Sequence, residues 1–239
     1  MSDAELADLS EVATSPVGFD LDEQGALPSG EARVASLAVP IGLWLGALAL
    51  VLALARSARR IAASAESDGR VLATMLIRSA WVVALQSVLA TVVVHAIGGV
   101  SWAASPATLG VALLFAGVAT LLHLAFVAWW GPVGTAVSVV LLGLQAVAAG
   151  GILPRDVLGV PFADIAPVLP MTHAVDALQA IAAGTGGAAG TAAVGGAVAM
   201  LVLFVLLGLL AAFLAVRAAR RRMTGERIRA LDALASAGA

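Results

Sequence analysis

The arrangement of the whole chain depends on residues 144–184, which read LQAVAAGGILPRDVLGVPFADIAPVLPMTHAVDALQAIAAG. This stretch starts in the last turns of an apolar segment, breaks at Gly150-Gly151 and resumes a helical pattern at Thr172. The four prolines in between are Pro154, Pro161, Pro167 and Pro170. Because proline has no amide hydrogen to donate and fixes its own φ, the backbone here is not one continuous helix. Irregular backbone is not tolerated against lipid, so we expect this stretch at a membrane surface or folded back into a protein-lined cavity.

The composition places the chain in the membrane class. Of its 239 residues, 61% are hydrophobic and 12% are charged, whereas soluble domains are roughly half apolar and about a quarter charged. More than half of the acidic residues precede the first apolar run, and nearly half of the arginines follow the last one. The absence of cysteine excludes disulfide frameworks, thiol nucleophiles and cysteine metal sites.

Gaps in the charge pattern predict an all-α, polytopic membrane bundle of five transmembrane helices. Each charge at the bilayer centre costs roughly 2.5–3.5 kcal/mol, and about 20 residues cross the hydrocarbon layer. The uncharged run between Arg78 and Arg155 is too long for one crossing, and interruptions near Gly98 and at Gly131-Pro132 divide it into three. The predicted spans lie near residues 34–55, 79–97, 107–129, 133–150 and 193–216.

These spans divide the chain into an acidic segment (1–33), a transmembrane domain (34–216) with a proline-rich loop (151–192), and a basic tail (217–239). Alternating crossings place the 56–78 connection and the basic tail on one side, and these hold every arginine except Arg33 and Arg155. The positive-inside rule then predicts a cytoplasmic carboxyl terminus, an extracytoplasmic amino terminus and an extracytoplasmic loop.

Residues 171–184 predict a short amphipathic helix within the loop. Apolar Met171, Val175 and Leu178 alternate with polar Thr172 and Asp176 at helical spacing. Thr172 is the predicted N-cap, and Gly184 the predicted stop. The segment is too short to be a sixth crossing. Two positions stay open, on the outer surface or dipping back into the bundle as a re-entrant helix.

Polar side chains inside the predicted spans form a candidate lining for a substrate or proton path. These are Gln86, Thr91, His95, His123 and Gln145. Thr91 and His95 lie four residues apart and share one helix face. The alternative is interhelical hydrogen bonding inside the bundle, which the absence of Asp, Glu and Lys from every predicted span favours.

The sequence holds no motif for catalysis or for a bound cofactor. The three histidines lie on separate elements without metal-ligand spacing, and the zinc-protease, serine-hydrolase and Walker motifs are absent. We therefore expect no enzymatic activity, no catalytic residue, no metal site, no cofactor and no nucleic-acid partner. If nucleotide hydrolysis powers transport here, the ATPase must be a separate chain.

A further set of residues comprises Gly131, Gly134, Leu144, Gln145, Gly150, Gly151, Pro154, Pro170, Met171, Thr172, His173 and Asp176. In order and spacing this set resembles the carboxyl-terminal membrane domain of the YhgE/Pip family, which includes the phage infection protein and is similar to ABC-2-type exporter permeases. The likeness covers about residues 15–184 and is most specific at 144–178. The chain departs from the family at His173, where Tyr is usual, and at Gln179, where Arg is frequent.

The resemblance implies a permease-like component of an export or secretion system in the bacterial cytoplasmic membrane. It also implies assembly as a homodimer or with a partner membrane protein. Because family members usually begin with one more span and a long extracellular domain, it further implies a carboxyl-terminal part or a shortened member. The competing function is a non-transporting scaffold or phage-type surface receptor anchored by the spans. A polar cavity converging on His95, His123 and Gln145 would favour transport, and dry helix contacts would favour the scaffold.

Overall fold

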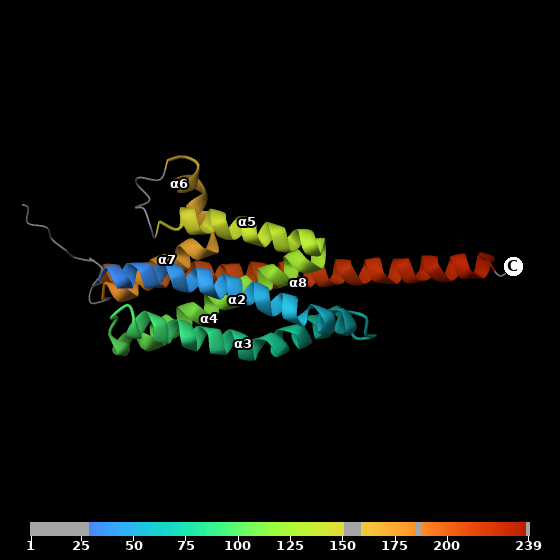
Figure 1. The fold of residues 1–239 in the computed structure, drawn as a ribbon, viewed down its shortest axis with the longest axis horizontal. Coiled ribbons are helices and arrows are strands. Elements are labelled where there is room, and N and C mark those ends of the chain that lie inside the picture. Colours follow the sequence, from blue (N-terminus) through green and yellow to red (C-terminus); the bar gives the residue numbers. More distant parts are fainter. Residues whose placement is uncertain (1–28, 151–158, 185–187, 238–239) are drawn as a thin grey trace, which may run out of the picture.

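The computed structural model describes residues 29–150, 159–184 and 188–237, and these form a bundle of helices without strands (Figure 1). The all-α prediction is therefore confirmed for this part of the chain. The elements are α2 (Gly30–Ala62), α3 (Asp68–Ala96), η1 (Trp102–Ala104), α4 (Ser105–Trp130), α5 (Pro132–Ala148), α6 (Phe162–Ile165), η3 (Ala166–Val168), α7 (Pro170–Ala182) and α8 (Ala188–Ala237).

Four helical segments are long and apolar enough to cross a membrane, as a multi-pass membrane protein requires. They are Gly30–Ala58, Asp68–Ala96, Trp102–Trp130 and Gly190–Ala230, and they contain four of the predicted spans. Three of them extend beyond the predicted limits because their helices continue through flanking charged residues, whereas Trp102–Trp130 extends through uncharged ones. The remaining predicted span, 133–150, corresponds to α5, whose 17 residues are fewer than the roughly 20 of a full crossing.

The long helices alternate in direction along the bundle (Figure 1). α2, α4 and α8 run one way, and α3 and α5 run back, so α8 begins at the end of the bundle where α2 begins. The α2–α3 connection meets α8 at the opposite end, where Arg220 contacts Asp68. We call this the arginine end. The two arginine-rich segments thus lie together, as alternating crossings require.

α4 is the central helix of the bundle, in contact with α2, α3, α5, α7 and α8. Its core positions include the fully buried Phe115, Ala116 and Val118. The approach of α8 is close because Gly208 faces Leu121, whose Cβ would lie 3.0 Å from a Cβ added at that glycine. Small residues at such crossings let membrane helices pack through van der Waals contact.

The pair formed by α6–η3 and α7 is bent by 84° between Val168 and Pro170. Leu169 adopts an extended backbone there, and Pro170 opens α7, where its missing amide hydrogen costs nothing. α7 packs on α2, α4, α5 and α8 and buries Met171 and Leu178 almost completely. Of the two predicted positions, the structure therefore has the helix folded back into the bundle rather than lying on its surface.

α8 is a single helix of 50 residues that continues past the rest of the bundle at the arginine end (Figure 1). The last predicted span and the basic tail are therefore parts of one helix. The predicted boundary between residues 216 and 217 marks a change from apolar to charged side chains, with no break in the backbone.

Candidate functional site

His123 of α4 joins three helices in the middle of the bundle. Its Nε2 lies 2.7 Å from Ser138 Oγ on α5, and its Nδ1 faces the carbonyl oxygen of Ala119. Since a carbonyl only accepts, Nδ1 carries the hydrogen and Nε2 of the neutral ring accepts from the serine hydroxyl. Trp44 of α2 contacts the histidine ring edge-on and donates through Nε1 to the Ser138 carbonyl, 3.3 Å away. All of these side chains are buried.

His95 makes a second, separate contact at the end of the bundle opposite the arginine end. Its Nδ1 lies 3.0 Å from the Val100 carbonyl oxygen, and its Nε2 lies 3.0 Å from Thr108 Oγ1. Trp102 stacks on the ring with centroids 5.1 Å apart. The histidine therefore fastens the end of α3 to the connection that leads into α4.

Gln145 of α5 holds the start of α7. Its Oε1 accepts a hydrogen bond from the backbone N–H of Met171 at 3.2 Å, which satisfies one of the free amide groups of the first helical turn. Thr172, the predicted N-cap, lies inside this first turn instead, because Pro170 starts the helix and Leu169 is the capping position. Within the described residues, Thr172 Oγ1 and Gln145 Nε2 are buried without a hydrogen-bond partner. The predicted stop is confirmed, since Gly184 follows α7 with φ +85.

The other two members of the candidate lining also serve helix contacts. The amide of Gln86 packs against Gly46 of α2, where an added Cβ would lie 2.9 Å from it. The Thr91 hydroxyl donates to the Ser87 carbonyl of its own helix at 2.8 Å. The five predicted lining residues therefore occupy separate contacts within and between helices and do not come together at one site.

Gly131 and Gly134, the first glycines of the family-like set, build the hairpin between α4 and α5. Gly131 has φ +58 and ψ −128, a conformation that is essentially limited to glycine. Gly134 faces the α4 backbone so closely that an added Cβ would lie 2.1 Å from the carbonyl oxygen of Phe126. Both positions therefore require glycine for backbone reasons alone.

The other described residues of the family-like set lie around the junction of α5, α6 and α7. Leu144 packs in a small apolar cluster with Ala166 and Leu169, and Gly150 ends α5 with φ +73. His173 Nε2 lies 2.9 Å from the Pro167 carbonyl oxygen, which ties α7 to η3. Asp176 is half-buried on α7. Gly151 and Pro154 lie outside the described residues, as does most of the predicted acidic segment.

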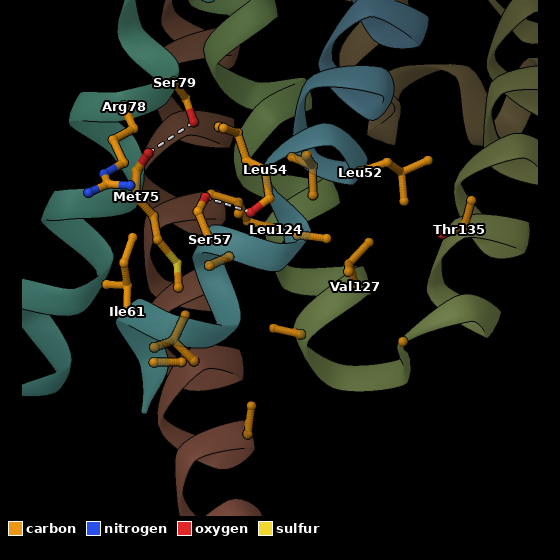
Figure 2. A pocket seen from close by; sticks show the side chains of 18 of the residues that line it. Leu52, Leu54, Ser57, Ile61, Met75, Arg78, Ser79, Leu124, Val127 and Thr135 are labelled. Atoms are coloured by element: carbon orange, nitrogen blue, oxygen red, sulfur yellow. Dashed lines mark hydrogen bonds between the residues drawn. The ribbon is translucent and has the colours of Figure 1, made fainter. Parts of the chain in front are cut away.

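A cavity of about 540 Å³ lies at the arginine end, between α2, α3, α4, α5 and α8 (Figure 2). Its walls are apolar except for four residues, which are Ser57, Arg78, Ser79 and Thr135. The hydroxyls of Ser57 and Ser79 donate to the carbonyls of Leu54 and Met75 on their own helices. The volume lies within the roughly 300–1,000 Å³ range of small-molecule sites. None of the candidate lining residues reaches this cavity.

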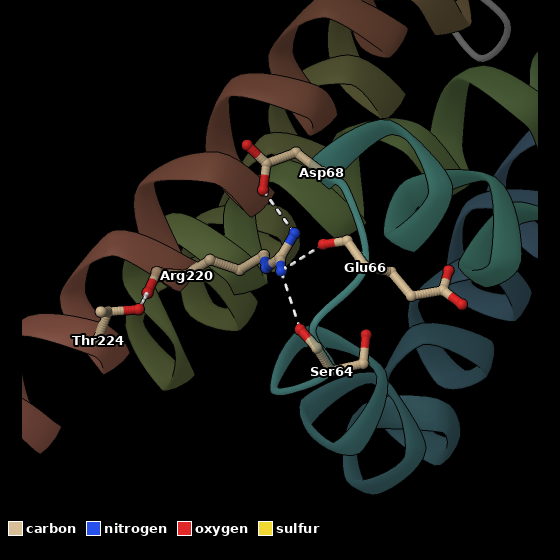
Figure 3. Close-up of polar contacts among 5 residues, drawn as sticks. All are labelled: Ser64, Glu66, Asp68, Arg220 and Thr224. Carbon is tan, nitrogen blue, oxygen red and sulfur yellow. Dashed lines mark hydrogen bonds and ion pairs between the residues drawn. The ribbon is translucent and has the colours of Figure 1, made fainter.

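Arg220 of α8 contacts the α2–α3 connection at the arginine end (Figure 3). Its guanidinium contacts Asp68 Oδ1 at 2.6 Å and donates to the carbonyl oxygens of Ser64 at 2.9 Å and Glu66 at 2.6 Å. These contacts tie the last helix to the α2–α3 connection. Sequence reasoning missed them, since it assigned the tail arginines only to one side of the membrane.

No protein-family model matches the chain, and no curated protein matches it closely enough to count as a relative. Within the described ranges, no three His, Asp or Glu side chains come together in a way that could hold a metal ion.

Proposed function

We propose that this chain is a permease-like component of an export or secretion system of YhgE/Pip type in the bacterial cytoplasmic membrane. Its amino terminus lies outside and its carboxyl terminus lies in the cytoplasm. The observation that carries the proposal is the difference between the two ends of the bundle. The arginine end contains the cavity, whereas the opposite end is filled by α7, which folds back into the bundle after the 84° bend.

The filled end supports a gating role for the α6–α7 pair. α7 buries its apolar side chains among α2, α4, α5 and α8, and Gln145 holds its first turn. At the same end, His95 and Trp102 fasten the α3–α4 connection. A transporter that admits substrate from one side at a time needs one such closed end and one open end.

The partners follow from the same proposal. The part of α8 beyond the bundle carries Arg227 and Arg229 on an exposed helix, a surface on which a cytoplasmic partner such as a separate ATPase can act. A homodimer or a second membrane subunit would complete the assembly in the lipid bilayer.

The test compares what the host bacterium secretes. A deletion strain is complemented with the wild-type gene, with Ala128→Phe, which fills the cavity, or with Ala53→Phe, which places the same ring on an exposed part of α2. Quantitative proteomics and metabolomics of the culture medium should show the same components lost in the deletion strain and in Ala128→Phe, at equal membrane levels of each protein. Unchanged secretion in the deletion strain would refute export.

The second candidate is a non-transporting scaffold or surface receptor. Its support is the burial of His95, His123 and Gln145, each hydrogen-bonded in a separate helix contact of the described bundle. Phage adsorption to the same strains distinguishes the two functions. A receptor predicts adsorption that depends on the gene and is equal for Ala128→Phe and Ala53→Phe, together with unchanged secretion.

A further inference from the structure

The cavity at the arginine end is long as well as apolar. Its α2 wall runs from Val51 to Ala62, about 16 Å at ~1.5 Å per residue. The lining also includes Met223 of α8, Leu124 of α4 and Thr135 of α5. Such a shape suits a chain-like apolar group lying along the helices.

Arg78 is the charged residue of this wall (Figure 2). Its side chain follows α3 towards Met75, which places the guanidinium towards the arginine end. Two other arginines at this end have carboxylate partners in the structure, since Arg220 contacts Asp68 and Arg70 lies 3.7 Å from Glu66. Within the described part of the chain, Arg78 has no such partner. A guanidinium of this kind is suited to a phosphate, to which it can form two parallel hydrogen bonds.

The polar groups of the wall argue against a peptide. A bound peptide would bring backbone N–H and C=O groups that need partners in an apolar site. The hydroxyls of Ser57 and Ser79 already donate to carbonyls of their own helices, which leaves only Arg78 and the Thr135 hydroxyl as side-chain donors for a ligand. An acyl chain needs no hydrogen bonds, and its burial removes apolar surface from water or from loosely packed contacts.

We propose that this cavity binds one acyl chain of an anionic phospholipid, with the phosphate held by Arg78. This inference rests on the proposed function, because it names the class of molecule that would enter the cavity at the arginine end. Charge at the cytoplasmic face supports the choice, because exposed arginines there attract anionic headgroups at about 1 kcal/mol each.

The test measures lipid binding to the purified full chain in detergent by native mass spectrometry. Phosphatidylglycerol should bind about tenfold more tightly than phosphatidylcholine. Arg78→Gln should weaken phosphatidylglycerol binding about tenfold, the size of one charge-assisted hydrogen bond. Arg56→Gln is the matched control, because Arg56 is exposed as Arg78 is but lies outside the cavity lining, and its effect should stay within twofold.

Ala128→Phe tests the position of the acyl chain, with Ala53→Phe as its control. The first should abolish tight binding of phosphatidylglycerol, and the second should leave it unchanged. Equal losses in Arg78→Gln and Arg56→Gln, or full binding to Ala128→Phe, would overturn the proposal. Displacement of the lipid by millimolar inorganic phosphate would assign Arg78 to a soluble anion instead.

Binding in detergent requires no transport, so the two proposals fail separately. Intact phosphatidylglycerol binding with unchanged secretion in the deletion strain would remove the export function alone. Lost secretion in the deletion strain, with no lipid selectivity in the purified protein, would remove the lipid alone.

Discussion

Gly134→Ala is expected to destabilise the bundle far more than a one-carbon change usually does. The added Cβ would lie 2.1 Å from the carbonyl oxygen of Phe126 and 2.4 Å from its carbonyl carbon. Both atoms belong to the α4 backbone, so no side-chain rotation relieves the clash. The turn cannot open freely either, because the N–H of Gly134 donates to the Gly131 carbonyl at 3.0 Å and the N–H of Gly131 to the Val127 carbonyl at 2.9 Å.

The magnitude follows from two opposing effects. Overpacking typically costs about 1–3 kcal/mol, and a clash with the backbone of the central helix belongs at the upper limit. Alanine in place of a helical glycine regains about 1 kcal/mol of helix propensity. The expected net loss is therefore about 2 kcal/mol. Gly143 of the same helix has nothing within 4 Å of an added Cβ, so Gly143→Ala should be neutral or stabilise by up to about 1 kcal/mol.

The assay is reversible unfolding of the purified chain in mixed micelles, in which the fraction of dodecyl sulfate is raised and helicity is followed by far-ultraviolet circular dichroism. The free energy of unfolding of the two variants should differ by about 2–3 kcal/mol, with Gly134→Ala the less stable. Equal stabilities, or a Gly134→Ala variant as stable as the wild type, would show that α4 and α5 do not meet as closely as the structure has them.

Three further predictions concern other contacts. A double-mutant cycle of Arg220→Gln and Asp68→Asn, measured by the same unfolding assay, should give a coupling free energy of about 1–2 kcal/mol, since the pair is partly buried; a value near zero would contradict the contact. Gln145→Ala should cost about 2–4 kcal/mol in that assay, because it empties a buried position and leaves the first turn of α7 without its acceptor; unchanged stability would refute this role. Single cysteines at Asp164 and Ser236 of this cysteine-free chain should react with an impermeant maleimide from outside and from inside the cell, respectively; labelling of both from one side would exclude the predicted orientation.

The long helices could be predicted from sequence because a buried charge is expensive and its absence is visible in the residue order. The helix limits could not be predicted in this way. Arg56 and Arg60 continue α2 beyond its apolar part, since arginine is a good helix former and sits in water there. α5 is short for a different reason, because its start is fixed by the turn at Gly131 and its end by Gly150.

The candidate site was harder to predict because sequence shows which residues share a helix but not which helices meet. Thr91 and His95 do lie on one helix, yet Thr91 bonds its own backbone while His95 bonds Thr108 of the next helix. The cavity could not be predicted from the sequence, because its walls consist of the same aliphatic residue types that cover the outside of the helices. Arg78 was predicted only as the limit of a span, although its place beside an apolar cavity is its most informative property.

The two ends of the bundle are held by contacts of different strength, and this difference bears on how such a protein could work. At the filled end, α7 is fixed by buried apolar side chains and by Gln145, so moving it would expose both an apolar face and an unpaired amide group. At the arginine end, Arg220 bonds a carboxylate and two carbonyls of a short connection that water can replace. The α2–α3 connection (63–67), which is mostly exposed and lies outside the buried cluster of Val71, Leu72 and Val216, should therefore open at a lower free-energy cost than α7, because regions with few buried apolar contacts open first. A mechanism that requires α7 to move must therefore draw its free energy from a partner or a bound substrate, whereas local motion of the α2–α3 connection need not.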